Sequence, residues 1–138
     1  MMNNQHPHIS DTCFYPVEIT IPGAGAVVSF ERALPLLYDT VEGVLLVHPG
    51  GNHGKGTLEL GVAGEEIFPE GFHARTFMLM QSSHHEDAVV NRDFERYMYG
   101  FKERAKGSTV AVKYTEPSNG DSGLLYLIFK LTKINPCG

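Results

Sequence analysis

The sequence predicts a mostly β fold, an antiparallel two-sheet β-sandwich of jelly-roll type with at most one short helix. Three observations predict it: short stretches of alternating apolar and polar residues, turn-forming residues between them, and a length of 138 residues, which suits one domain. About seven or eight short strands bury their apolar faces most simply as two packed sheets. A small β-barrel is the alternative arrangement.

The chain is expected to form a single β-sandwich domain over residues 13–138, preceded by a flexible N-terminal arm over residues 1–12. The arm is polar and contains Asn, Gln and His, so it has little apolar surface to bury. The apolar fraction of the whole chain, 42%, is that of an ordinary globular protein and provides for a stable core in the rest of the sequence.

Alternating residues indicate two strands near the start of the domain. The strand that begins at Phe14 has an apolar face that consists of Tyr15, Val17, Ile19 and Ile21. Pro22 and Gly23 then indicate a turn, and the β-branched stretch Ala26–Phe30 is expected to be extended again. Pro35 lies in the next apolar stretch and excludes both a helix interior and a central strand there.

More strands are expected in the middle of the chain. Val44–His48 is a compact apolar run between glycine and proline, which is typical of a buried strand. Thr57–Val62 alternates, and Ala63-Gly64 offers a tight reversal into a short strand over Glu66–Phe68. Thr76–Gln81 is a further apolar strand candidate.

Residues 87–104 are the one stretch for which a helix is expected. Asp87 suits the N-cap position. The apolar residues that follow recur at helical spacing: Val90, Phe94, Tyr97 and Phe101. Gly100 and the density of aromatic residues around it leave a bent strand open as the alternative.

A final β-hairpin is expected at the end of the chain. Ser108–Thr115 and Leu124–Thr132 are both rich in residues that favour strands. The segment between them, residues 117–123, consists almost entirely of turn formers and predicts the connecting loop.

Charge and cysteine content exclude several classes of partner. The net charge is −5, with 11 basic residues against 16 acidic ones, so neither nucleic acid nor an anionic membrane is an expected partner. No apolar run is long enough to span a bilayer, and the first residues do not resemble a signal peptide. Cys13 and Cys137 are interpreted as free thiols of a reducing compartment. The expected location is therefore the cytoplasm or an assembled virion.

The glycine-rich segment His48–Thr57 looks at first like a phosphate-binding loop. Such a P-loop has a first glycine and then Gly-Lys followed by Ser or Thr, and it opens a helix. Aligned on Gly54-Lys55, proline replaces the first glycine, Gly56 replaces the hydroxyl residue, and a strand-like segment follows. We therefore interpret the segment as a loop between strands and expect no cofactor.

Gly120-Asp121-Ser122-Gly123 superficially matches the nucleophile segment of chymotrypsin-like serine proteases. His48 or His53 could be imagined as the base and Asp87 as the orienting acid. However, the 16 residues after Ser122 are too few to complete the second barrel of such an enzyme. A hairpin turn explains the same residues, so no catalytic residue is predicted.

Histidines supply the only candidates for a metal site. His84-His85-Glu86-Asp87 places four potential ligands in sequence, and His53 and His73 could join them from elsewhere. A zinc site needs three or four converging ligands, which this spacing does not demand. Loop histidines in solvent are the preferred interpretation, and no metal is expected.

The lack of an intact catalytic motif favours a non-enzymatic structural or assembly protein. The layout is similar to small single-sandwich virion and appendage proteins in its polar arm, short strands and wide glycine-rich loops, so a phage capsid or appendage subunit is the specific expectation. Other protein subunits, in a homo-oligomer or larger assembly, are the expected partners. Tyr97, Tyr99 and Phe101 are the predicted interface, because aromatic residues are enriched at contact cores.

The alternative function is a small ligand-binding or carbohydrate-binding β domain, or a metal-dependent enzyme that uses the His-rich loops. Carbohydrate recognition would have to use Tyr and His, because the chain has no Trp. A metal assay distinguishes the metal-dependent enzyme from the structural protein.

Overall fold

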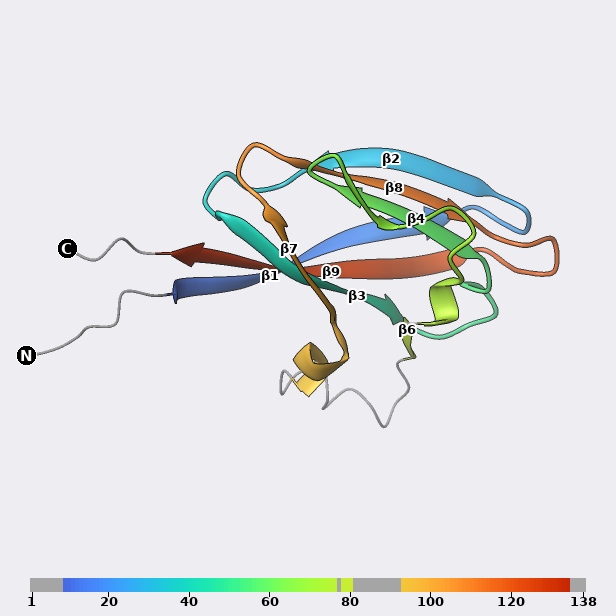
Figure 1. Ribbon diagram of the computed structural model, residues 1–138. Helices are drawn as coiled ribbons and strands as arrows, with labels where there is room; N and C mark the ends of the chain where they lie inside the picture. The colour runs from blue at the N-terminus through green and yellow to red at the C-terminus, as the bar shows by residue number, and fades with distance from the viewer. Residues whose placement is uncertain (1–8, 77, 81–92, 135–138) are drawn as a thin grey trace, which may run out of the picture.

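The structure is a computed structural model that describes residues 9–76, 78–80 and 93–134. These residues form two sheets packed face to face, and the sheets do not close into a barrel (Figure 1). The predicted mostly β sandwich is therefore confirmed, and the alternative of a small barrel is wrong. Neither of the two short helices among the described residues is long and apolar enough to cross a membrane.

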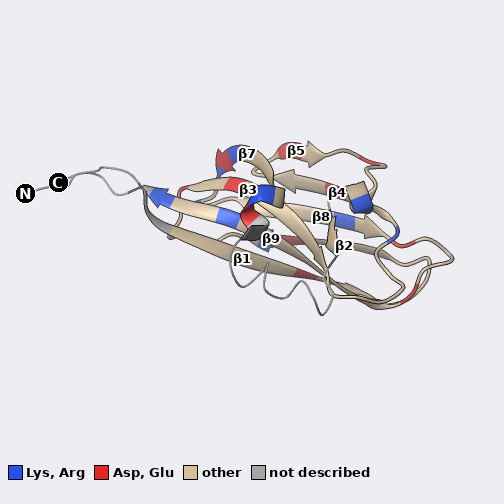
Figure 2. Cartoon of the chain, turned by 90° about the horizontal axis from the view of Figure 1, so that it is seen from below, with Lys and Arg blue, Asp and Glu red and all other residues tan. Residues whose placement is uncertain are grey.

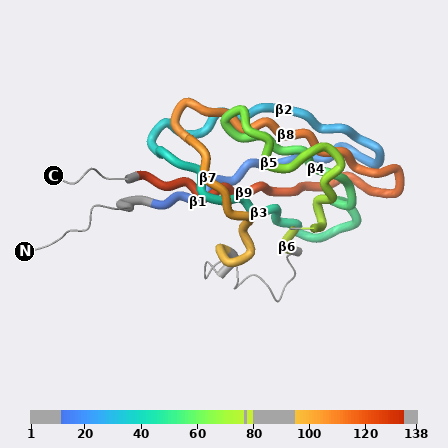
Figure 3. The backbone as a smooth tube through the Cα atoms, viewed as in Figure 1, coloured from blue at the N-terminus to red at the C-terminus, as the bar shows by residue number. Residues whose placement is uncertain are grey.

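The first sheet, sheet A, has the order β1-β9-β3-β6, and β7 also pairs with β3. Its strands are β1 (Ile9–Ile21), β3 (Thr40–His48), β6 (Met78–Met80), β7 (Tyr99–Arg104) and β9 (Gly123–Ile134). All of its pairs are antiparallel except β3 with β6. β1 and β9 run side by side over their whole length, from Ile9 opposite Ile134 to Ile21 opposite Gly123 (Figure 3).

The second sheet, sheet B, is antiparallel throughout and has the order β2-β8-β4-β5. Its strands are β2 (Val27–Ala33), β4 (Thr57–Val62), β5 (Glu65–Phe68) and β8 (Thr109–Thr115). The turn between β4 and β5 is the predicted reversal, because Ala63 and Gly64 both have positive φ, 55° and 81°. The predicted loop over residues 117–123 likewise joins β8 to β9.

The core lies between the two sheets and follows the alternation of the sequence. Val110, Val112 and Tyr114 of β8 are buried, whereas the residues between them are exposed. The inward residues of β1 and β4 pack against the same core: Val17, Ile19, Ile21, Leu58, Leu60 and Val62. Each fully buried Val or Leu side chain contributes about 1.5–3 kcal/mol relative to an exposed one.

β3 is buried on both faces, which explains its unbroken apolar run. Val44 and Leu46 point into the main core, whereas Leu45 and Val47 form a second, smaller cluster on the outer face of sheet A. That cluster also contains partly buried residues from β1, β6, β9 and the segment before β7: Phe14, Leu79, Met98, Tyr126 and Ile128.

The expected helix over residues 87–104 is wrong for the part that the structure describes. A 3₁₀ helix, η2, covers Asp93–Tyr97, and β7 then forms a strand; residues 87–92 lie outside the described residues. β7 pairs with β3 in a register that places Gly100 opposite Gly43. A Cβ atom at Gly43 would lie 3.2 Å from the carbonyl oxygen of Tyr99, so the two strands approach closely where side chains are absent. The bent strand was the better interpretation.

Two boundaries differ from the sequence prediction. β1 begins at Ile9, so residues 9–12 belong to a strand of sheet A and not to an arm; residues 1–8 lie outside the described residues. The strand expected over Thr76–Gln81 is the short β6, preceded by a 3₁₀ turn, η1 (Ala74–Thr76). Cys13 is half-buried in β1, and Cys137 lies outside the described residues.

Close approach of two backbones makes Gly56 a sensitive position. A Cβ atom there would lie 1.6 Å from the carbonyl oxygen of Thr115, which is backbone and cannot turn away. We expect Gly56→Ala to lower the free energy of unfolding by about 2–3 kcal/mol through overpacking. Gly23→Ala is the matched control, because no atom lies within 4 Å of its Cβ position. Equal urea midpoints for the two variants would contradict this account.

Candidate functional site

Four polar side chains are buried together at one end of the sandwich. His48 ends β3, His53 lies in the loop that follows, and Tyr114 and Glu116 come from the end of β8. We call them the polar cluster. The exposed fraction of each residue is 4% or less, so the cluster is shielded from solvent. Buried polar groups need hydrogen-bond partners, and those partners define what the cluster can do.

Glu116 is the centre of this cluster. Its Oε1 accepts a hydrogen bond of 2.5 Å from the Tyr114 hydroxyl and one of 3.0 Å from the backbone N–H of Gly54. Its Oε2 accepts one of 3.0 Å from the backbone N–H of Asp121. Hydrogen bonds to an ionised acceptor are about twice as strong as neutral ones. One carboxylate therefore fastens the β3–β4 loop and the β8–β9 loop to the end of β8.

The glycine-rich loop uses its amides for these internal bonds. The N–H of Gly54 donates to Glu116, and the N–H of Gly56 donates to the Tyr114 hydroxyl over 2.9 Å. In a P-loop, such amides would point outward to a phosphate. Here the Glu116 carboxylate and the Tyr114 hydroxyl accept the hydrogen bonds of these amides. This arrangement accounts for the resemblance of the segment to a P-loop and supports its interpretation as a structural loop.

The two histidines are stacked and bonded to the backbone. Their ring centroids lie 4.4 Å apart. Nδ1 of His48 accepts a hydrogen bond from the N–H of Gly50, so its Nε2 carries the proton and donates to the carbonyl of His53 over 2.7 Å. Nε2 of His53 donates to the carbonyl of Leu124, also over 2.7 Å. The rings thereby join the β3–β4 loop to itself and to β9.

Burial sets the charge state of two members of the cluster. Desolvation lowers the pKa of His48, the hydrogen bond to the His53 carbonyl opposes this effect in part, and electrostatic interactions with His53 and Arg75 lower the pKa further. Desolvation also raises the pKa of Tyr114, and its hydrogen bond to Glu116 adds to the rise. Tyr114 is therefore a stable hydrogen-bond donor, and His48 is held neutral. At the rim of the cluster, Arg75 donates from Nε to the carbonyl of Gly54 over 3.4 Å.

The structure brings together two segments that the sequence singled out, the glycine-rich loop and Gly120–Gly123, because both donate hydrogen bonds to Glu116. Ser122 is exposed in the β8–β9 loop, and its N–H donates to Oδ1 of Asp121. No hydrogen bond joins the Ser122 hydroxyl to His48 or His53 among the described residues. The ring nitrogens of His48 are both bonded to the backbone. The imagined acid Asp87 lies outside the described residues.

The candidate metal ligands do not gather in the described part of the chain. Those residues contain no group of three or more His, Cys, Asp or Glu side chains that could hold an ion. His53 is buried in the polar cluster, and His73 is exposed beside the start of β4. His84 and His85 lie outside the described residues. The expected absence of a metal thus stays a prediction.

Sequence reasoning missed Tyr114 and Glu116, although their spacing contained the signal. Val110, Val112 and Tyr114 are the inward residues of β8, and the same alternation places Glu116 inward as well. A carboxylate at an inward position must meet hydrogen-bond donors. The adjacent loops are rich in glycine, whose amides can approach such a carboxylate closely. A Cβ atom at Gly120, for example, would collide with the Glu116 carboxylate.

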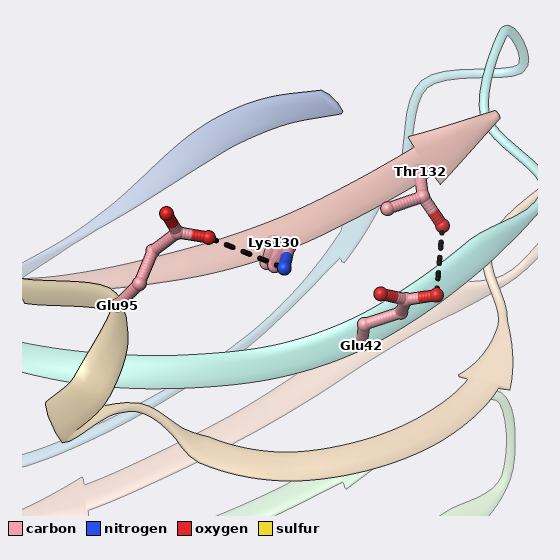
Figure 4. A network of polar contacts seen from close by, with 4 residues as sticks. All are labelled: Glu42, Glu95, Lys130 and Thr132. Carbon is pink, nitrogen blue, oxygen red and sulfur yellow. Dashed lines mark hydrogen bonds and ion pairs between the residues drawn. The ribbon is translucent and has the colours of Figure 1, made fainter. Parts of the chain in front are cut away.

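The predicted interface residues lie on and beside β7. Tyr97 and Tyr99 are 53% and 47% exposed, whereas Phe101 is partly buried against the main core. The Tyr99 ring contacts Phe68 and Phe101, with centroids 5.1 and 6.2 Å away. The preceding η2 helix is held over sheet A by an ion pair of 3.2 Å between Glu95 and Lys130, and Figure 4 shows this pair beside the Thr132–Glu42 hydrogen bond.

Comparison of the chain with protein-family models, curated proteins and solved structures found no match. Its function is therefore argued from its own geometry.

Removal of the Glu116 carboxylate should destabilise the fold strongly. Glu116→Ala leaves two buried donors, the Tyr114 hydroxyl and the Gly54 N–H, without an acceptor. Each unsatisfied buried donor costs about 1–3 kcal/mol, so we expect a loss of about 2–5 kcal/mol. Glu116→Gln should lose less, because its amide oxygen still accepts one of these bonds. The matched control is Glu66→Ala at an exposed position, expected to change stability by no more than about 0.5 kcal/mol. Similar urea midpoints for Glu116→Ala and Glu66→Ala would refute this role.

Stability should depend on pH through His48. Its pKa is lower in the folded protein than the ordinary value of 6.5, so the unfolded chain binds the proton first as the pH falls. The stability is therefore complete above pH 6.5 and decreases below it until the folded-state pKa is reached, by at most about 1.4 kcal/mol per pH unit. Urea unfolding between neutral pH and about pH 5 measures this slope. His48→Gln should reduce it, whereas His73→Gln, at an exposed position, should not; equal slopes would exclude His48 as the cause.

Proposed function

We propose that the protein is a non-enzymatic structural subunit that assembles with other protein subunits, in the first instance with copies of itself. The observation that carries this proposal is the pair of half-exposed tyrosines at β7, an edge strand of sheet A. A virion subunit is the specific form of this proposal, and its support is the similarity of layout already described.

Tyr97 and Tyr99 have the properties of contact residues. Large side chains that are already held in place lose little conformational entropy on binding, and tyrosine is enriched at the centres of protein interfaces. Tyr99 is held by ring contacts with Phe68 and Phe101 while almost half of its surface remains exposed. Tyr97 ends the η2 helix, which the Glu95–Lys130 ion pair anchors to sheet A.

The other edge of sheet A is less suited to association. β1 is 13 residues long and pairs only with β9 among the described strands, so its outer edge is open. Pro16 lies in the middle of this strand and has no N–H to offer another strand. Proline in an edge strand is a common device against edge-to-edge pairing. This supports contact through β7 and not through β1.

An enzyme or small-ligand binding domain is the second candidate, and the polar cluster favours it less. A catalytic histidine needs a ring nitrogen directed at a substrate, but His48 uses both of its ring nitrogens on the backbone. The cluster is also shielded from solvent, so a substrate would have to open the loops to reach it.

Loss of the two tyrosines should weaken self-association. We expect Tyr97→Ser with Tyr99→Ser to raise the dissociation constant at least about 10-fold, as loss of a contact centre does. Sedimentation velocity over a range of concentrations measures this constant, and thermal unfolding verifies the fold of the variant. The control is Leu36→Ser with Leu37→Ser, since both leucines are 68% exposed in the β2–β3 connection. A parent protein that stays monomeric at every concentration would refute the proposed function.

A further inference from the structure

The outer face of sheet B contains a cavity of about 500 Å³. Its floor is formed by Gly61 of β4 and Ala111 of β8, which lie opposite each other in the sheet. Glu31 of β2 pairs with Ala111 on one side, and Glu66 of β5 pairs with Gly61 on the other. One row across the sheet therefore reads Glu-Ala-Gly-Glu, with two small residues between two carboxylates. We call this surface the groove.

The chemistry of the groove suits a partner with several separated cations. Glu59 and Glu70 also line it, and Lys113 is its only basic residue. No three of its carboxylates are close enough together to hold a metal ion. Within the described part of the chain, no ion pair is formed by the five charged side chains of the groove: Glu31, Glu59, Glu66, Glu70 and Lys113. The carboxylates are thus spread along the walls of the groove and not gathered at one point.

The same chain carries a complementary surface on β7. Lys102 and Arg104 are exposed and share one face of the strand, and Lys106 is exposed in the turn that follows. We call these three residues the basic strip. None of them is paired with a carboxylate among the residues that the structure describes. Figure 2 shows basic residues in blue on β7 and acidic residues in red at β5.

The basic strip is short enough to fit between the two flanking glutamates of the groove. Glu31 and Glu66 stand three strand spacings apart, which is about 14 Å at the usual separation of neighbouring strands. Lys102 and Arg104 are two residues apart on β7, which is about 7 Å along a strand, and Lys106 follows in the turn. A β7 segment laid across the groove would therefore place its cations between the two glutamates, above the floor that Gly61 and Ala111 leave free.

We propose that the groove of one copy of this chain binds the basic strip of a second copy. This inference rests on the proposed function and names the surface that meets β7. The two surfaces differ, so the contact is head-to-tail, and a pair of copies keeps one unused groove and one unused strip. Repetition builds a ring if the rotation closes and a filament if it does not.

Charge reversal on each surface tests this contact. The groove variant is Glu31→Lys with Glu66→Lys, and the strip variant is Lys102→Glu with Arg104→Glu. Each variant alone presents two surfaces of like charge, so we expect its self-association constant to fall at least 10-fold below that of the parent. An equimolar mixture pairs opposite charges at every contact and should recover the association of the parent. Light scattering during size exclusion measures all three samples at low salt.

A control variant changes the same total charge on another surface. Thr12→Lys, Glu18→Lys and Thr20→Lys place the new charges at exposed positions of β1, and this variant should associate like the parent. Failure of the mixture to recover association, with all variants folded, would overturn the groove contact and leave self-assembly intact. A parent that is monomeric at all salt concentrations would overturn both this contact and the proposed function. A monomeric parent that binds oligolysine through the groove would assign the groove to another basic partner and overturn the second copy as occupant.

Discussion

The buried carboxylate of Glu116 is the constraint on which the end of the sandwich depends. An ionised group without solvent must be surrounded by donors, and this one receives them from Tyr114 and from the backbone of two separate loops. The loop backbone must approach the cluster closely to bring its amide donors to Glu116. Glycine permits this approach, since a Cβ atom at Gly54 would collide with the His48 ring. One polar group thus holds the β3–β4 loop and the β8–β9 loop against the end of β8.

The polar cluster and the loops beside it contain His, Ser, Asp, Tyr and Glu, which is the composition of many active sites. The hydrogen bonds of His48, His53, Tyr114 and Glu116, however, join these side chains to backbone groups or to one another. The exposed aromatic and charged side chains lie elsewhere, on β7 and on the outer face of sheet B. The proposed function is therefore placed on these surfaces and not on the polar cluster.

Alternation along the chain predicted most strands, because a half-buried strand must place every second residue in the core. Thr57–Val62 and Thr109–Thr115 follow that rule closely. The rule failed at β7, where Tyr97 and Phe101 have helical spacing, yet Tyr97 is exposed and Phe101 is partly buried. Pairing with β3 makes Tyr99–Arg104 a strand, and pairing between distant segments cannot be predicted from local spacing. The hydrogen bond from Gly54 to Glu116 could not be predicted for the same reason, since its donor lies in a loop 62 residues away.

The place of β9 in sheet A has a consequence for synthesis on the ribosome. β9 is the last strand of the described chain, yet it lies between β1 and β3 and pairs with both. Sheet B can be completed once β8 has left the exit tunnel, but β1 and β3 have no partner between them until Gly123–Ile134 emerges. Until β9 is available, the inward residues of β1 and β3 therefore lack the core contacts that Leu125, Leu127, Phe129 and Leu131 provide. A nascent chain stalled before β9 would expose these inward residues to chaperones, and the complete core would form only as the final strand is delivered.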